Sequence, residues 1–239
     1  MASVRLGRVA AVIPAFNEAA SIGRVVRGIR RARIADRVYV VDDGSRDGTA
    51  MVARKAGARV IRHRRNSGVG SAIRDGYRAA LRARFGVVLV MGGDDQDRPE
   101  EAGRLLAAIA RGADFAQGSR WLPGGRTVNI PVFRRLGTTL YSLAFSLVSG
   151  RRMTDATNGF RAVRARVLLA VNLGREWLDR YELEPYLLFK AVNLGFRVRE
   201  VPVTKRYHAD GRSWTRMRPL LDWWSIFRPL VLLGTGIRD

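Results

Sequence analysis

The sequence of 239 residues contains no cysteine, only three lysines and only two histidines. Without cysteine, the chain has no disulfide framework and no thiolate zinc site, which fits a reducing compartment. Carboxylates are also scarce: 21 acidic residues stand against 43 lysines and arginines, so the formal net charge is +22 and almost all cations are arginines. An excess of this size indicates an anionic partner, which is a phosphorylated substrate, an acidic membrane surface or nucleic acid.

The sequence also lacks a recognisable signal peptide, internal repeats and a second domain. Its first apolar run continues directly into a predicted strand, Val9–Ile13, and no small-residue cleavage site follows. With 47% hydrophobic and 27% charged residues, the composition is that of a folded protein. We therefore predict one large domain over residues 1–218 and a short apolar segment over residues 219–239.

No apolar run is long enough to predict a membrane span with certainty. The last segment reads LLDWWSIFRPLVLLGTGI, with one aspartate, one arginine and a proline near its middle. A spanning helix needs about 20 mainly apolar residues. Trp223, Trp224 and Phe227, flanked by arginines, suit a bilayer interface instead. We expect an amphipathic helix that touches the membrane, and the alternative is a helix that packs on the domain or on a second subunit of a homo-oligomer.

Strands and helices alternate through the first half of the chain. Val9–Ile13, Arg37–Val41 and Ala58–Ile61 are predicted strands with amphipathic helices between them, an order typical of a parallel, doubly wound sheet. Val87–Met91 and Asp114–Gln117 are two further predicted strands. We therefore predict an α/β fold with a mostly parallel central sheet flanked by helices.

Helices and loops dominate the predictions for the second half. The predicted elements are a Gly/Pro-rich loop over Pro123–Pro131, helices over Phe133–Val148, Arg164–Leu173 and Leu183–Asn193, and an edge or mixed strand over Phe196–Thr204. A basic loop with interleaved aromatics follows, over Lys205–Arg218.

Polar side chains follow three of the predicted strands. Asp42 and Asp43 end the second strand, the run Asp94–Asp97 follows the fourth, and Arg120 follows the fifth. Ligands of open α/β sheets bind at the carboxyl ends of strands. Oxygen ligands grouped there suit a hard divalent cation and a phosphorylated ligand. The alternative for the acidic turn alone is that it only caps a helix.

Seven motifs together resemble the family 2 glycosyltransferases of GT-A fold. They are PAFNE, VVDDGS with DGT, NSGVGSAIRDGY, the acidic turn GGDDQD, GSRW, DATNGFR and EVPVTKRYHADGRS, in this order from about Val9 to Arg218. The last two are similar to those of dolichyl- and polyprenyl-phosphate mannosyl- and glucosyltransferases. This resemblance implies inverting transfer of a hexose from a nucleotide sugar, of the GDP-mannose or UDP-glucose type, to a polyprenyl or dolichyl phosphate.

The resemblance also implies roles for individual residues. Nucleotide-sugar binding falls to Pro14, Phe16, Glu18, Val41, Asp43, Gly92, Gly93 and Asp94, and the loop around Gly68–Ser71 would line the nucleotide pocket. The metal, Mg²⁺ or Mn²⁺, falls to Asp94 and Gln96. The family's acidic turn usually reads Asp-x-Asp-x-Gln, whereas Gly92 stands at its first aspartate, and we expect weaker metal binding without nucleotide. Asp95 and Asp97 are the candidates to replace the lost carboxylate.

Catalytic roles fall to Asp94, Arg120 and Arg134, because arginines and a metal stabilise a leaving diphosphate. Arg134, Arg206 and Arg212 are the candidates for the acceptor phosphate. His208 and Trp214 stand where the family has an arginine and a lysine. A polyprenyl phosphate is already anionic and needs no general base, so His63 is interpreted as structural or solvent-exposed.

Three alternatives remain open from the sequence. A soluble or saccharide hydroxyl acceptor would need a general base, for which Asp155 is the candidate. A nucleic-acid-binding protein is disfavoured because the arginines are dispersed and no binding motif is present. A catalytically degenerate relative is the third, because of Gly92. For the enzyme, we expect a cytoplasmic protein, peripheral on the inner face of the cell membrane, where basic residues favour anionic lipid.

Overall fold

The computed structural model of the chain describes residues 6–207 and 221–234. Its elements are β1 (Val9–Ala15), α1 (Ile22–Arg31), β2 (Arg37–Asp42), α2 (Thr49–Lys55), β3 (Arg59–Arg62), α3 (Val69–Arg82), β4 (Val87–Val90), the 3₁₀ turn η1 (Pro99–Glu101), α4 (Ala102–Ala110), β5 (Phe115–Ser119), β6 (Arg126–Val128), α5 (Val132–Ser149), β7 (Arg161–Arg164), α6 (Ala165–Ala170), the 3₁₀ turn η2 (Glu176–Leu178), α7 (Leu183–Asn193), β8 (Val198–Pro202), β9 (Thr204–Arg206) and α8 (Leu221–Gly234).

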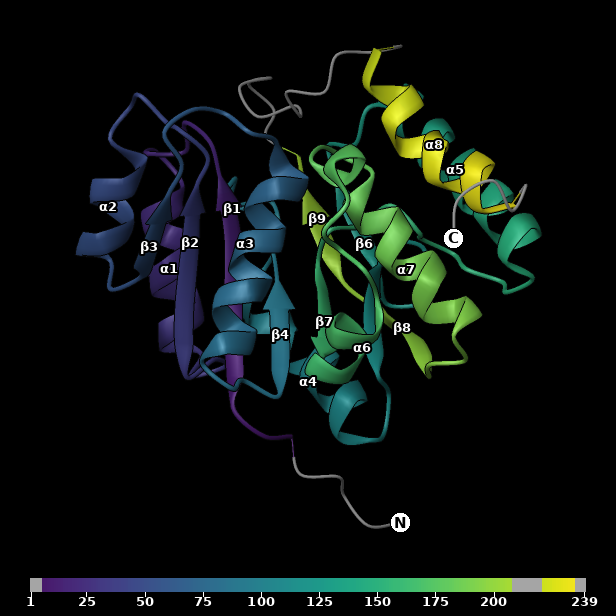
Figure 1. Cartoon of the computed structure of the whole chain (residues 1–239), viewed down its shortest axis with the longest axis horizontal. Coiled ribbons are helices and arrows are strands. Elements are labelled where there is room, and N and C mark those ends of the chain that lie inside the picture. Colours follow the sequence, from purple (N-terminus) through teal and green to yellow (C-terminus); the bar gives the residue numbers. More distant parts are fainter. Residues whose placement is uncertain (1–5, 208–220, 235–239) are drawn as a thin grey trace.

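A seven-stranded sheet runs through the molecule in the order β3-β2-β1-β4-β7-β5-β8 (Figure 1). All neighbouring strands are parallel except where β7 pairs with β4 and β5. Helices cover both faces of the sheet, so the predicted α/β architecture is confirmed. Because β1, β2, β4 and β5 run in one direction, their carboxyl ends share one edge of the sheet.

Three of the described strands, β6, β7 and β9, are not predicted by the sequence. The strand β7 lies within the polar stretch before the predicted helix Arg164–Leu173, so the observed helix α6 is shorter than predicted. Arg161 in β7 is fully buried and its guanidinium lies 3.1 Å from the Glu184 carboxylate. Because β7 begins and ends with an arginine, the hydropathy of this stretch does not indicate a buried strand. The predicted loop Pro123–Pro131 contains β6, which pairs with β9 in a second, two-stranded sheet.

Alternating side chains of β1 face two separate cores. Ala10 and Val12 pack with the α3 side of the sheet, while Val9, Ala11 and Ile13 pack with α1 and α4. This period of two is that of a strand covered on both faces, and it explains why β1 is apolar throughout. The packing holds the carboxyl end of β1 rigidly beside those of β2 and β4.

The helices α5 and α8 lie together at one side of the molecule (Figure 1). Phe227 of α8 contacts Tyr141 of α5 edge to face, with ring centroids 5.1 Å apart, and Leu230 is buried. The predicted apolar face of α5 exists, but much of it points outward. Among the described helices, none combines the length and the apolar character needed to cross a membrane.

Candidate active site

The carboxyl ends of β1 and β2 bring several predicted donor-site residues together. Pro14 is paired with Val41 in the parallel register, and the N–H of Asp43 donates to the Ala15 carbonyl at 2.8 Å. Pro14 is half-buried, whereas Val41 is completely buried. Val41 therefore supports the strand end from within the core, and Pro14 is the more accessible of the two.

The loop after β1 is tied to the loop after β2. The N–H of Asn17 donates to the Ser45 hydroxyl at 2.8 Å, and the N–H of Glu18 donates to the Thr49 hydroxyl at 2.7 Å. The Ser21 hydroxyl lies 2.9 Å from a Glu18 carboxylate oxygen and 2.8 Å from the Gly93 carbonyl. Phe16 and Glu18, both half-buried, are thus held beside the acidic turn.

Asp43 organises the loop that precedes α3. Its Oδ1 accepts from the Ser67 N–H and contacts His63 Nδ1 at 2.7 Å, and its Oδ2 accepts from the Gly68 N–H at 2.8 Å. A carboxylate has about four acceptor positions, and these three contacts leave about one of them for a further donor. His63 is not solvent-exposed, because its side chain is 11% exposed between Asp43 and Asp75. Sequence alone gives no signal for this pair of contacts.

The carboxylates of the acidic turn after β4 have different partners. Asp94 is half-buried and its Oδ1 accepts from the Gln96 N–H at 3.2 Å. Asp95 adopts a left-handed conformation, with φ of 62°, and pairs with Arg24 at 2.8 Å. Asp97 is buried and pairs with Lys205 Nζ at 3.0 Å. Asp95 and Asp97, the candidates to replace the lost carboxylate, are each paired with a cation in this structure, and their role toward a metal stays a prediction.

Lys205 is the partner that the sequence does not reveal. Burial lowers the pKa of its amine, but Asp97 and then Asp94 raise it, and the resulting pKa is above the usual value. Lys205 thus places a permanent positive charge next to the turn. A strand-to-turn bridge between Asp97 and Lys205 and the bond from the Arg206 N–H to the Gln96 carbonyl, at 2.9 Å, join β9 to this turn.

Both glycines of the turn lie so close to neighbouring atoms that a Cβ would crowd them. A Cβ at Gly93 would lie 3.2 Å from the Ala15 Cβ and the Pro14 carbonyl, so this glycine fits the turn against β1. A Cβ at Gly92 would lie 2.8 Å from Asp94 Oδ1. The glycine at this position thus gives room to the Asp94 carboxylate.

Arg120 and Arg134 both contact one tyrosine, Tyr207. The Arg120 guanidinium donates from Nη1 to the Tyr207 hydroxyl at 2.7 Å, and the Arg134 guanidinium lies 5.3 Å from the centre of the Tyr207 ring. Tyr207 is buried, and although it lies within the motif EVPVTKRYHADGRS, no role is predicted for it from the sequence. The two predicted catalytic arginines are therefore brought together, with Arg134 half-buried and Arg120 deeply buried.

Arg120 is held chiefly by Asp155. The Asp155 carboxylate accepts from Arg120 Nε at 2.6 Å and from Nη2 at 2.7 Å, and it is fully buried. Burial alone would lower the pKa of Arg120, but Asp155 and Tyr207 raise it above its ordinary value. Nη2 also donates to the Thr157 hydroxyl. Asp155 is therefore a structural counterion, and its geometry does not suit the general base of the saccharide alternative.

The remaining acceptor candidates are not gathered at this cluster. Arg206 is exposed, and only its backbone N–H contacts the acidic turn. Arg212 lies outside the described residues.

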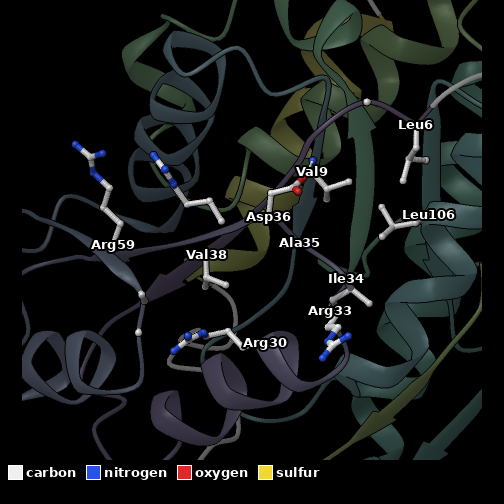
Figure 2. A pocket seen from close by; sticks show the side chains of 14 residues that line it. Leu6, Val9, Arg30, Arg33, Ile34, Ala35, Asp36, Val38, Arg59 and Leu106 are labelled. Carbon is white, nitrogen blue, oxygen red and sulfur yellow. Dashed lines mark hydrogen bonds between the residues drawn. The ribbon is translucent and has the colours of Figure 1, made fainter.

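A hollow of about 930 Å³ opens at the other edge of the sheet, where β1, β2 and β3 begin (Figure 2). Arg30, Arg33 and Arg59 line it, but they extend in different directions, and Arg30 Nη1 donates to the Ala56 carbonyl. None of the predicted site residues lines this hollow. The candidate active site is therefore the edge formed by the carboxyl ends of the strands.

The chain is similar to several curated enzymes. It is 35% identical over 202 residues to the undecaprenyl-phosphate mannosyltransferase of Micrococcus luteus, covering 82% of this chain and 83% of that one. It is 35% identical over 204 residues to the polyprenol monophosphomannose synthase of Mycolicibacterium smegmatis, covering 82% and 77%. It is 32% identical over 200 residues to the dolichyl-phosphate hexose transferase of Haloferax volcanii, covering 84% and 83%.

The fold is shared with solved structures. Glucosyl-3-phosphoglycerate synthase of Mycobacterium tuberculosis, in complex with Mn²⁺, uridine diphosphate and glucosyl-3-phosphoglycerate, superimposes with a TM-score of 0.73 at 21% identity. The match covers 98% of this chain and 81% of that one. Residues 10–170 match the model of the family described as "Glycosyl transferase family 2". The chain therefore belongs to glycosyl transferase family 2 and is a nucleotide-sugar-dependent glycosyltransferase of GT-A fold.

Proposed function

We propose that this enzyme transfers a hexose from a nucleotide sugar to a polyprenyl phosphate at a membrane surface. The observation that carries the proposal is the cluster of Arg120, Tyr207 and Arg134, in which Asp155 neutralises only one of two guanidiniums. A half-buried, cationic Arg134 suits an acceptor that brings its own negative charge. The named relatives from Micrococcus luteus and Mycolicibacterium smegmatis support the same acceptor class and a mannosyl donor.

The phosphate acceptor also agrees with the state of Asp155. A sugar hydroxyl must lose its proton to attack an anomeric carbon, so it needs a nearby base. Asp155 accepts three hydrogen bonds from Arg120 and is fully buried, which removes it from that role. A phosphate oxygen attacks without proton transfer. The displacement would invert the anomeric centre as the nucleoside diphosphate leaves.

On the donor side, a divalent cation fits part of the acidic turn. Asp94 and Gln96 offer a carboxylate and an amide oxygen, which are the hard ligands that Mg²⁺ and Mn²⁺ take, and diphosphate oxygens and water would complete the set. A bound cation would neutralise charge that develops on the leaving diphosphate. The solved relative with Mn²⁺ and uridine diphosphate supports this assignment. GDP-mannose and UDP-glucose are the donor types we propose.

The outer face of α5 supports membrane association. Leu136, Leu140, Leu143 and Leu147 recur at helical spacing and are each 53–75% exposed. Single exposed leucines are common, whereas a continuous apolar stripe on a soluble protein marks an interaction surface. Trp224, on the helix α8 that packs against α5, is 59% exposed. With a net charge of +22, we propose that this surface lies on anionic lipid and brings the site to its lipid acceptor.

Transfer of radioactive hexose tests the acceptor. Purified enzyme is incubated with labelled GDP-mannose or UDP-glucose, Mn²⁺ and detergent-dispersed polyprenyl phosphate, and the mixture is extracted with organic solvent. We expect label in the organic phase with wild type and none with Asp94→Ala. Label that stays in water, or that moves only to soluble saccharides, would contradict the lipid acceptor.

Binding to vesicles tests the membrane surface separately. A Leu140→Glu, Leu143→Glu variant should keep its unfolding temperature, because both side chains are already exposed, and should lose sedimentation with vesicles that contain anionic lipid. Leu169→Glu is the matched control, because Leu169 is 72% exposed on α6, away from the stripe. Equal sedimentation of the three proteins would remove α5 from the proposed surface.

A further inference from the structure

His63 lies between two carboxylates at the donor edge of the sheet. Its Nδ1 is 2.7 Å from Asp43 Oδ1 and its Nε2 is 3.2 Å from Asp75 Oδ2. An ionised carboxylate only accepts hydrogen bonds, whereas a neutral imidazole carries one N–H. Contacts at both nitrogens therefore need the doubly protonated imidazolium. In the neutral ring, one nitrogen lone pair would face a carboxylate.

The contacts of His63 reach the backbone of the loop over residues 64–68. Asp43, which it contacts, also accepts from the N–H groups of Ser67 and Gly68 at 2.8 Å each. Gly68 has φ of +100°, and its Cα faces the Asp179 carbonyl so closely that a Cβ would lie 2.2 Å from that oxygen. Gly68 is therefore packed closely against the Asp179 carbonyl, and the Asp43 carboxylate holds the backbone N–H groups of Ser67 and Gly68.

We propose that protonated His63 is a positioning residue of the donor site, which joins Asp43 at the end of β2 to Asp75 on α3 and so holds the loop over residues 64–68 against the nucleotide. The inference rests on the proposed function, because Asp43 follows β2 at the same edge of the sheet as the acidic turn to which that function assigns the diphosphate and its cation. His63 itself touches no reacting atom. Donor affinity then depends on the protonation of this one ring.

The groups around His63 favour its charged form. Asp43, which follows β2, and Asp75 of α3 contact the ring, and Arg78 Nη1 pairs with the other Asp75 oxygen, Oδ1, at 2.9 Å. The backbone N–H of His63 donates to the Asp42 carbonyl at 2.9 Å.

Four other charged side chains belong to the neighbouring residues. The Asp42 carboxylate is 3.4 Å from Arg62 Nε, and the side chains of Arg64 and Arg65 in the loop are exposed. The two carboxylates that contact the ring are therefore the nearest charges.

The pKa of His63 is raised chiefly by its hydrogen bond to Asp43, while burial opposes the rise. A raised pKa in the folded state means that the stabilisation is fully present below the unfolded pKa, about 6.5. It is lost as the pH rises through the raised value. The loop is therefore held most firmly below about pH 6.5, and it loosens as the pH rises through the raised pKa of His63.

Imidazole NMR tests the protonation directly. The chain has two histidines, so His63→Gln assigns the His63 resonances by their loss. We expect both ring nitrogens of His63 to carry protons at pH 6.5, with a midpoint above 6.5. Asp75→Asn should lower that midpoint, and Arg82→Gln, an exposed change on the same helix, should leave it in place. A midpoint at or below 6.5, or a single N–H tautomer at that pH, would overturn the proposal.

Calorimetry of nucleotide binding tests the positioning role. Guanosine and uridine diphosphates are titrated with Mn²⁺ into wild type, His63→Gln and Arg82→Gln. For the nucleotide that binds, we expect the wild-type affinity to fall about tenfold as the pH rises through the midpoint, the effect of losing one charge-assisted contact. His63→Gln should bind about tenfold more weakly at pH 6.5, without that pH dependence.

The outcomes separate this role from the proposed function. Nucleotide binding that ignores both the pH and the substitution overturns the role of His63 alone. Absence of nucleotide binding at every pH overturns the proposed function, and the positioning role with it. Arg82→Gln must follow wild type throughout, because a general effect of removing positive charge would also appear there.

Discussion

Replacing Asp155 with asparagine removes the carboxylate that holds Arg120. Both side chains are almost completely enclosed, with exposed fractions of 0% and 5%, and they share two short contacts at 2.6 and 2.7 Å. Asparagine keeps the shape of the site, but it leaves a buried guanidinium without its counterion. The Tyr207 and Thr157 hydroxyls remain as neutral partners and do not restore the charge balance.

The expected loss is large because the pair is buried. Removing one partner of a buried ion pair costs about 3–5 kcal/mol of unfolding free energy. For a domain of this size, each kcal/mol lowers the unfolding temperature by about 2–4 °C. Asp155→Asn should therefore unfold roughly 6–20 °C below wild type.

Urea denaturation followed by circular dichroism measures the change. Asp95→Asn is the matched control, because its partner Arg24 is 56% exposed and an exposed pair contributes about 1 kcal/mol or less. A loss below about 1 kcal/mol for Asp155→Asn would refute the assignment of Asp155 as a structural counterion. A stable but inactive Asp155→Asn protein would instead favour a general base.

Three further substitutions probe the site. Tyr207→Phe removes one hydrogen bond to Arg120 and keeps the ring beside Arg134, so urea denaturation should show a loss of about 1.5–3 kcal/mol. Gly68→Ala should lower both the unfolding temperature and nucleotide affinity, because φ is +100° and the Cβ would lie 2.2 Å from a carbonyl oxygen; unchanged calorimetric titrations would contradict this. Gly92→Asp sets a Cβ 2.8 Å from Asp94 Oδ1 and adds a second carboxylate to the turn, so a thermal-shift assay should show lower stability without Mn²⁺ and a larger gain with Mn²⁺ than in wild type.

Local patterns predict the elements that carry their own periodicity. The strands β1 to β4 and the helix α7 are apparent because apolar residues recur at the spacing of buried strands and helices. The acidic turn is apparent because its carboxylates adjoin such a strand. The strand β7 is missed because it lacks such a local pattern. The burial of its Arg161 depends on Glu184, a residue 23 positions away.

The candidate site, too, is predicted only in part from the sequence. Its motifs predict which strand ends hold polar groups, but not which of those groups are occupied by partners. Asp97 is paired because Lys205 of β9 lies beside it, and Asp155 is paired because Arg120, which follows β5, lies beside it. Such pairs join segments far apart in the chain, so neither hydropathy nor local spacing reports them.

The central claim is that the acceptor attacks through an anionic phosphate oxygen. Comparison of polyprenyl phosphate with the matching polyprenol, in the same detergent and with the same labelled nucleotide sugar, tests it most directly. The account predicts labelled product from the phosphate, with a phosphodiester signal in the phosphorus NMR spectrum, and none from the alcohol. Comparable transfer to the alcohol would contradict it, because a hydroxyl needs the general base that Asp155, bound to Arg120, does not provide.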